Sequence, residues 1–206
     1  MNNKSGKKTM LFSILVSSPG PLVVGLGLMI GKSSTQLADF IRRSAELLAI
    51  ILAYITYSLT TKDGMTNLAK KEKLEKTSNI FVGITMILSG IIMMLLAIFN
   101  STEDKGNVIP GLVIAILGFI ANSIFWIKYN KLGIQTNNNI LIVQSKLYRA
   151  KTFVDASVMI ALFVVLLMPN SMISYYFDLV GTIVVSIYLA LTGIDTLVKI
   201  NKKRIV

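Results

Sequence analysis

Six long apolar segments, separated by polar loops, set the strongest limit on how this chain can fold. They cover about residues 9–30, 34–60, 79–99, 108–129, 144–168 and 174–199. Each is long enough to cross a bilayer as a helix, which takes about 20 residues. A barrel is not expected, because its strands would alternate between apolar and polar residues and these segments do not. The sequence therefore predicts an all-α membrane protein with six transmembrane helices.

The amino-acid composition supports a membrane protein and excludes several chemistries. Hydrophobic residues make up 53% of the chain and charged residues 15%, whereas a soluble domain carries about 25% charged residues. There is no cysteine and no histidine, which excludes disulfides, thiolate metal sites and imidazole chemistry. Neither a Gly-rich phosphate loop nor a nucleophile–base pair occurs. We therefore expect neither an enzyme nor a bound cofactor.

The first apolar segment begins like a secretory signal. Lysines precede its apolar run, as in the basic front of a signal peptide. No small-residue cleavage site follows, and Pro19 and Pro21 interrupt the run. We interpret the segment as a retained first span that bends at residues 17–21.

Lysine and arginine are distributed unevenly between the loops. Of the 21 in the chain, fifteen lie at the two ends and in the second and fourth loops, two lie in the other loops, and four lie within spans. The fifteen are Lys4, Lys7, Lys8, Lys62, Lys70, Lys71, Lys73, Lys76, Lys128, Lys131, Lys146, Lys199, Lys202, Lys203 and Arg204. Since basic loops stay in the cytoplasm, both termini are expected there, with the chain in the inner (plasma) membrane.

This asymmetry also accounts for the net charge of +11 without a nucleic-acid partner. The lysines between positions 70 and 76 are expected to face anionic membrane lipid. About seven residues follow the sixth span. We therefore expect a single transmembrane domain over residues 1–206, with no C-terminal soluble domain.

Charged residues inside two spans mark the candidate site. Asp39, Arg42 and Glu46 share one face of the second span at i, i+3 and i+7, and Lys151 and Asp155 are one turn apart on the fifth. Charges within a membrane are costly unless they face a partner or water. The simplest arrangement pairs Glu46 with Lys151 and Arg42 with Asp155. Such a cluster is either a polar transport site or a structural network of ion pairs.

Other polar residues of the spans are interpreted as structural. Asn122, Ser123 and Trp126 in the fourth span are expected to pack or to lie at the membrane interface. Asp178 and Asp195 lie near the two ends of the sixth span.

Several short stretches resemble one known family. Residues 31–40, which end in Leu-Ala-Asp-Phe, are similar to the opening of the second helix of the cation diffusion facilitators, or cation efflux proteins. Lys73-Leu74-Glu75 resembles the start of their third helix, residues 152–162 resemble part of their fifth, and Phe177-Asp178 resembles the opening of their sixth. The resemblance covers essentially the whole chain. It implies a six-helix bundle with both ends in the cytoplasm, a cation as solute, and a homodimer.

The chain departs from this family at the metal site. The family's metal positions correspond here to Arg42 and Glu46 in the second span and to Leu147 and Lys151 in the fifth. A zinc site needs carboxylate or imidazole ligands, and of these four only Glu46 qualifies. Arg42 and Lys151 would repel a divalent cation. We therefore expect no metal site.

Two hypotheses about function follow. In the first, the chain is a divergent cation-efflux-like transporter, proton-coupled, in which Glu46 is protonated and Lys151 and Asp155 exchange partners. In the second, it is a transport-inactive scaffold or accessory protein whose charges form a structural ion-pair network. A direct contact between Glu46 and Lys151 without a water-filled cavity favours the second hypothesis, and an open cavity that reaches Glu46 favours the first.

Overall fold

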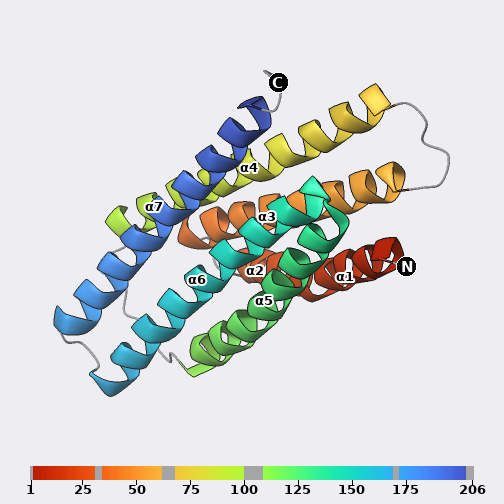
Figure 1. Cartoon of the computed structure of the whole chain (residues 1–206). Coiled ribbons are helices and arrows are strands. Elements are labelled where there is room, and N and C mark those ends of the chain that lie inside the picture. Colours follow the sequence, from red (N-terminus) through yellow and green to blue (C-terminus); the bar gives the residue numbers. More distant parts are fainter. Residues whose placement is uncertain (1, 31–33, 62–67, 100–108, 169–171, 203–206) are drawn as a thin grey trace.

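A bundle of long helices makes up the computed structural model of the chain (Figure 1). The structure describes residues 2–30, 34–61, 68–99, 109–168 and 172–202. In this part of the chain every regular element is a helix. The helices are α1 (Asn2–Ser17), α2 (Pro19–Ile30), α3 (Ser34–Thr60), α4 (Leu68–Phe99), α5 (Ile109–Thr136), α6 (Asn139–Leu167) and α7 (Met172–Lys202). The all-α prediction is confirmed.

The first span is broken where the prolines predict. Only Ser18 separates α1 from α2, and its N–H still donates to the carbonyl of Ile14 at 2.9 Å. Pro19 has no N–H and cannot continue the α-helical ladder, but it suits the first turn of a new helix. Counting α1 and α2 as one crossing, the helices cross the bundle six times.

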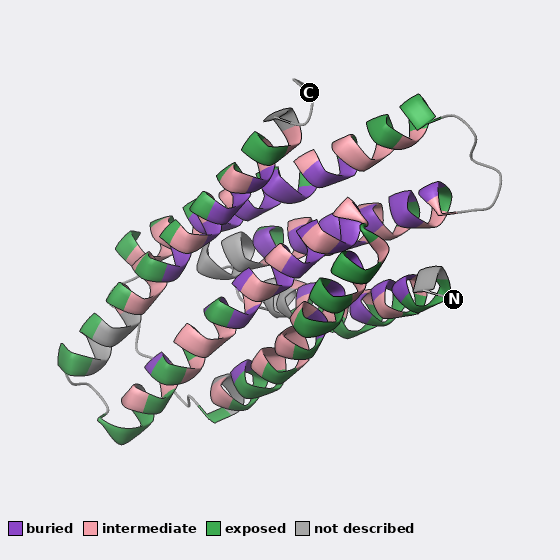
Figure 2. Ribbon diagram, in the orientation of Figure 1, coloured by how far each residue is buried: buried purple, intermediate pink, exposed green. Residues whose placement is uncertain are grey.

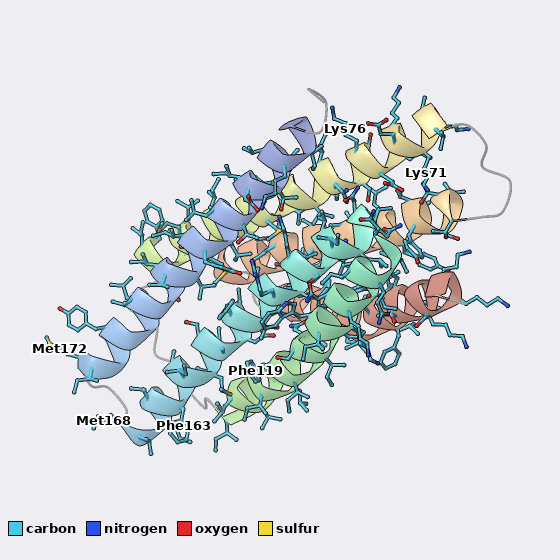
Figure 3. All side chains as sticks on the ribbon, viewed as in Figure 1. Lys71, Lys76, Phe119, Phe163, Met168 and Met172 are labelled. Carbon is cyan, nitrogen blue, oxygen red and sulfur yellow. The ribbon has the colours of Figure 1, made fainter. Side chains whose placement is uncertain are left out.

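The helix ends gather at two poles. The start of α1, the end of α3, the turn between α5 and α6, and the end of α7 lie toward the same pole (Figure 1). Lys71 and Lys76 lie at this pole, which we call the lysine end, while Met168 and Met172 lie at the other (Figure 3). An even number of crossings gives this arrangement, and the lysine end is the one that the distribution of basic residues assigns to the cytoplasm.

The outside of the bundle is apolar. Three helices in the described part of the chain are long and apolar enough to cross a membrane by length and composition: Leu68–Phe99, Leu112–Thr136 and Leu179–Ile200. Large apolar side chains such as Leu117, Ile127 and Val184 are about 60% exposed. Exposed residues lie outward and buried ones inward along the helices (Figure 2). Lipid around the bundle accounts for these exposed apolar side chains, because a protein surrounded by water rarely exposes so many of them.

Small residues allow α4 and α7 to approach closely. A Cβ added at Gly90 would lie 2.6 Å from the carbonyl oxygen of Ser186, and one added at Gly193 would lie 2.7 Å from the carbonyl oxygen of Gly83. Such contacts leave no room for a side chain. Helices in membranes use small residues in this way, because close backbone packing replaces the hydrophobic effect as the source of association.

A tight turn holds α5 against α6. Asn137 has a φ of 46°, in the left-handed region that Asn tolerates better than most residues. The side chain of Asn138 caps α6 by accepting from the N–H groups of Ile140 at 3.0 Å and Leu141 at 3.3 Å. The two helices therefore lie antiparallel and side by side.

Candidate functional site

Glu46 lies at the centre of a buried polar network. Its side chain is only 5% exposed. Oε1 accepts from Nη1 of Arg42 at 3.1 Å and from Oγ of Ser89 at 3.3 Å. Oε2 lies 3.6 Å from Nζ of Lys151. We call Arg42, Glu46, Ser89 and Lys151 the Glu46 site; it joins α3, α4 and α6.

Helical register brings these side chains together. Arg42 lies one turn before Glu46 on the same face of α3. Ser89 belongs to a row of buried polar residues on α4, with Ser78 and Thr85 at i−11 and i−4. A single carboxylate therefore faces two cations in a region that is shielded from solvent, where electrostatic interactions are strong.

Aromatic rings form one side of the site. Nζ of Lys151 lies 5.2 Å from the centre of the Tyr148 ring, which suits a cation–π contact. The hydroxyl groups of Tyr148 and Ser17 are 3.2 Å apart, and those of Tyr129 and Ser13 are 2.5 Å apart. These bonds attach α1 to α5 and α6 beside Lys151.

Asp155 forms a second polar centre between α5 and α6. Nδ2 of Asn122 donates to its Oδ2 at 2.6 Å. Gly118, one turn before Asn122, leaves room for the carboxylate, because a Cβ there would lie 2.9 Å from Oδ2. Lys151 precedes Asp155 by one helical turn and so lies on the face of α6 that carries both centres.

The structure realises part of the expected arrangement. It brings Glu46 and Lys151 together, as predicted. Arg42 contacts Glu46 within its own helix, and Asp155 accepts from Asn122. Asp39 lies on α3 and Asp178 on α7, but their side chains are outside the described part of the structure.

Two residues of the site were not predicted from the sequence. Asn122 was expected to serve packing, and it instead donates to a carboxylate. Ser89 lies in a span without any charge, and the only signal for it is its i, i+7, i+11 spacing with Ser78 and Thr85 in an apolar run. Leu147, a position matched to the family's metal site, is 1% exposed and packs in the apolar core.

A third charged group lies at the lysine end. Nζ of Lys146 on α6 is 2.8 Å from Oδ2 of Asp195 on α7, and Nζ of Lys199 is 3.0 Å from Oδ1. The Asp195 side chain is 45% exposed and lies seven residues before the end of α7, at the lysine end, where we expect water to reach it. We call these three residues the Asp195 site. Lys146 was considered only as a marker of orientation in the sequence.

The donor set does not resemble a metal centre. Among the residues that the structure describes, no group of three or more His, Cys, Asp or Glu side chains converges. Both oxygens of Glu46 already face donors or cations. Zinc ligands in proteins are carboxylates, imidazoles and thiolates, and the groups nearest Glu46 are a guanidinium, an ammonium and a hydroxyl.

A comparison with protein families identifies the whole bundle. The family model of the cation efflux transmembrane domain matches residues 10–200. The chain belongs to the cation efflux family. The match runs from α1 to α7 and therefore includes the Glu46 site, the Asp155 centre and the Asp195 site. None of the curated proteins compared with the chain matches it. Its family makes it a multi-pass membrane protein of a class that transports cations rather than an enzyme.

Proposed function

We propose that this cation efflux protein is a proton-coupled cation transporter that works without the usual zinc site. The observation that carries the proposal is the family match over residues 10–200, since this family transports cations. The direct contact between Oε2 of Glu46 and Nζ of Lys151 at 3.6 Å, taken alone, favours the scaffold function considered below. Lys151 is an internal cation that occupies the place of a transported one. A proton or a cation that binds Glu46 has to displace it.

Lys151 has a second anion within one helical turn. When Glu46 takes up a proton on Oε2, the carboxylate loses its charge and Lys151 loses its partner. Asp155, four residues further on α6, can then become the counterion of Lys151.

A tightly bound divalent metal does not fit this proposal. Arg42 and Lys151 lie within 3.6 Å of the carboxylate that would have to hold the metal. Their repulsion of a dication is strong in a region of low dielectric constant. A proton or a monovalent cation needs only one of these partners to move.

A second function has a specific observation in its favour. Glu46 is nearly buried and already has Arg42, Ser89 and Lys151 as partners. A network that satisfies its charges in this way can hold α3, α4 and α6 in register without moving a solute. In that case the chain is a transport-inactive scaffold or accessory protein on the cation efflux fold.

Transport in proteoliposomes separates the two functions. The chain, Glu46→Gln, Lys151→Ala and a control, Asp195→Asn, are compared for uptake of monovalent and divalent cations and for the accompanying change in internal pH. The proposal predicts transport by the parent and by Asp195→Asn, and its loss in both variants of the Glu46 site. If the parent moves no cation and no proton while the two variants are merely less stable, the protein is a scaffold.

We also propose a location, an assembly and a domain extent. The family supports a homodimer. The distribution of lysines supports a location in the plasma membrane, with lipid at the basic loops. Each copy is a single transmembrane domain over residues 1–206, with six spans near the bounds given by the sequence. Crosslinking in native membranes tests the dimer, and a monomer at all protein densities would contradict it.

A further inference from the structure

Three buried polar side chains lie at the lysine end of the bundle. Tyr57 on α3, Ser78 on α4 and Gln144 on α6 are 0%, 1% and 0% exposed. The hydroxyl groups of Tyr57 and Ser78, and both polar atoms of the Gln144 amide, have no hydrogen-bond partner among the described residues. Buried polar groups are nearly always hydrogen-bonded, because an unpaired group has lost its bonds to water without replacing them. Something other than the described protein atoms is needed to satisfy them.

The register of the three helices places these residues on the faces that also carry the Glu46 site. Tyr57 shares the α3 face of Glu46 at i+11, Ser78 shares the α4 face of Ser89 at i−11, and Gln144 shares the α6 face of Lys151 at i−7. Since Glu46 contacts both Ser89 and Lys151, these three faces line the same interior.

The three residues lie closer to the lysine end than the Glu46 site does. At 1.5 Å per residue, they are displaced from it by roughly 10–17 Å toward the lysine end. Helical side chains lean toward the N-terminus of their helix. Tyr57 therefore leans back toward Glu46, and Gln144 leans toward the lysine end. This reduces the separation of the two side chains along the bundle axis. On the side of α1, the Tyr57 hydroxyl packs against Gly6, where an added Cβ would overlap it.

A mostly apolar layer, which also contains the buried Thr85 of α4, separates this level from the Glu46 site. Ile50 on α3, Val82 and Met86 on α4, and Leu147 on α6 are at most 1% exposed and belong to one packed core. They lie between the two polar levels on the same three helices. The bundle thus has a polar level at the lysine end, an apolar layer, and then the Glu46 site.

We propose that Tyr57, Ser78 and Gln144 hold a buried cluster of water. The set combines hydroxyl groups and an amide, which both donate and accept, and it contains no carboxylate. That mixture suits water, which bonds two to four polar partners in such sites, whereas the amide N–H₂ would oppose a cation. The cluster hydrates the lysine-end side of the apolar layer. Its role as the water through which the solute approaches Glu46 rests on the proposed transport function; its existence does not.

Radiolytic hydroxyl-radical labelling tests for this water directly. Radicals formed from bound water oxidise the nearest reactive side chains, even where bulk water cannot reach. Tyr57 is the probe, and Tyr129 is its matched control, since it is equally buried but its hydroxyl bonds to Ser13. We expect Tyr57 to be oxidised several-fold faster than Tyr129, and Gln144→Leu to reduce that rate to the level of Tyr129. Equal rates in the parent would overturn the proposal.

Thermal unfolding of Gln144→Leu provides a second measurement. If the amide is dry and unpaired, an apolar side chain of similar size removes a penalty and raises the melting temperature. If the amide binds water, the substitution breaks the cluster and lowers the melting temperature or leaves it unchanged. A rise together with unlabelled Tyr57 would refute the water site. Rapid Tyr57 labelling in a chain that transports nothing would retain the site and remove only its role in transport.

Discussion

The Glu46 site and the Asp195 site contain the same set of charges in different surroundings. Each has one carboxylate, one cation four residues away on the same helix, and one lysine from α6. The contacts of Asp195, at 2.8 and 3.0 Å, are shorter than those of Glu46, at 3.1 and 3.6 Å. The Asp195 side chain is 45% exposed, however, and that of Glu46 only 5%. Contact distance alone would therefore predict, wrongly, that the Asp195 site contributes more to stability than the Glu46 site.

Exposure to solvent decides which carboxylate contributes more to the stability of the protein. Around Asp195, water screens the charges and can solvate either lysine if the carboxylate is removed. Around Glu46, two cations would be left in the interior with no anion, which costs far more than the original pair gains. The buried carboxylate therefore couples three helices strongly, whereas the exposed one joins α6 and α7 through a contact that water screens.

The largest expected effect is that of Glu46→Gln on stability. The substitution keeps the size of the side chain and its bond from Ser89 but removes the charge that balances Arg42 and Lys151. We expect a loss of about 3–5 kcal/mol in the free energy of unfolding, as for other buried pairs that lose one partner. Denaturant unfolding in detergent micelles measures it. A loss no larger than that of Asp195→Asn would break the distinction between the two sites.

A double-mutant cycle measures the coupling across the helices. Glu46→Gln and Lys151→Met are compared alone and together, so that the double variant removes both charges of the pair. If Lys151 is held by Glu46, the double variant is more stable than the two single effects predict, by about 0.5–3 kcal/mol. The same cycle on Asp195 and Lys146 should give a smaller coupling. Strict additivity at positions 46 and 151 would show that their contact carries no energy.

Close packing against α4 also fixes the lysine end of α7, where Asp195 lies. Gly193 is two residues from Asp195, and a Cβ there would lie 2.7 Å from the carbonyl oxygen of Gly83. Gly193→Ala should therefore force α4 and α7 apart and destabilise the protein by about 1 kcal/mol, the lower end of the range for overpacking. Gly20→Ala is the control, since its nearest neighbour would be an ordinary 3.5 Å away. If Asp195→Asn costs more than Gly193→Ala, the ion pairs rather than the helix packing hold this end.

The sequence predicts the bundle well because a bilayer allows few alternatives. Apolar length gives the helices, the prolines at 19 and 21 give the break in the first span, and the asymmetry of lysine gives two poles. The contact between Glu46 and Lys151 can also be predicted from residue spacing, since each residue lies on the charged face of its helix.

Side-chain reach and hydrogen bonding are what spacing does not reveal. The sequence favours Arg42 as the partner of Asp155 by opposite charge, but Arg42 reaches Glu46 one turn away on its own helix. Asp155 has a neutral partner, Asn122, which no count of charges can identify. The close approach at Gly118 that makes room for Asp155 depends on how α5 packs against α6, and that packing is set by the whole bundle.

The smallest expected effect is that of Asp195→Asn. Its two lysines remain hydrated at the lysine end, so the loss should be at most about 1 kcal/mol, as for other exposed ion pairs. Raising the salt concentration should shrink even that difference, because the charges lie where ions can screen them. Unfolding of the parent and of Asp195→Asn at low and high salt measures both quantities. The same series on Glu46→Gln should show little salt dependence, because a side chain that is 5% exposed is screened poorly. If both variants respond to salt alike, ions reach Glu46 as easily as Asp195, and the interior around Glu46 is wet.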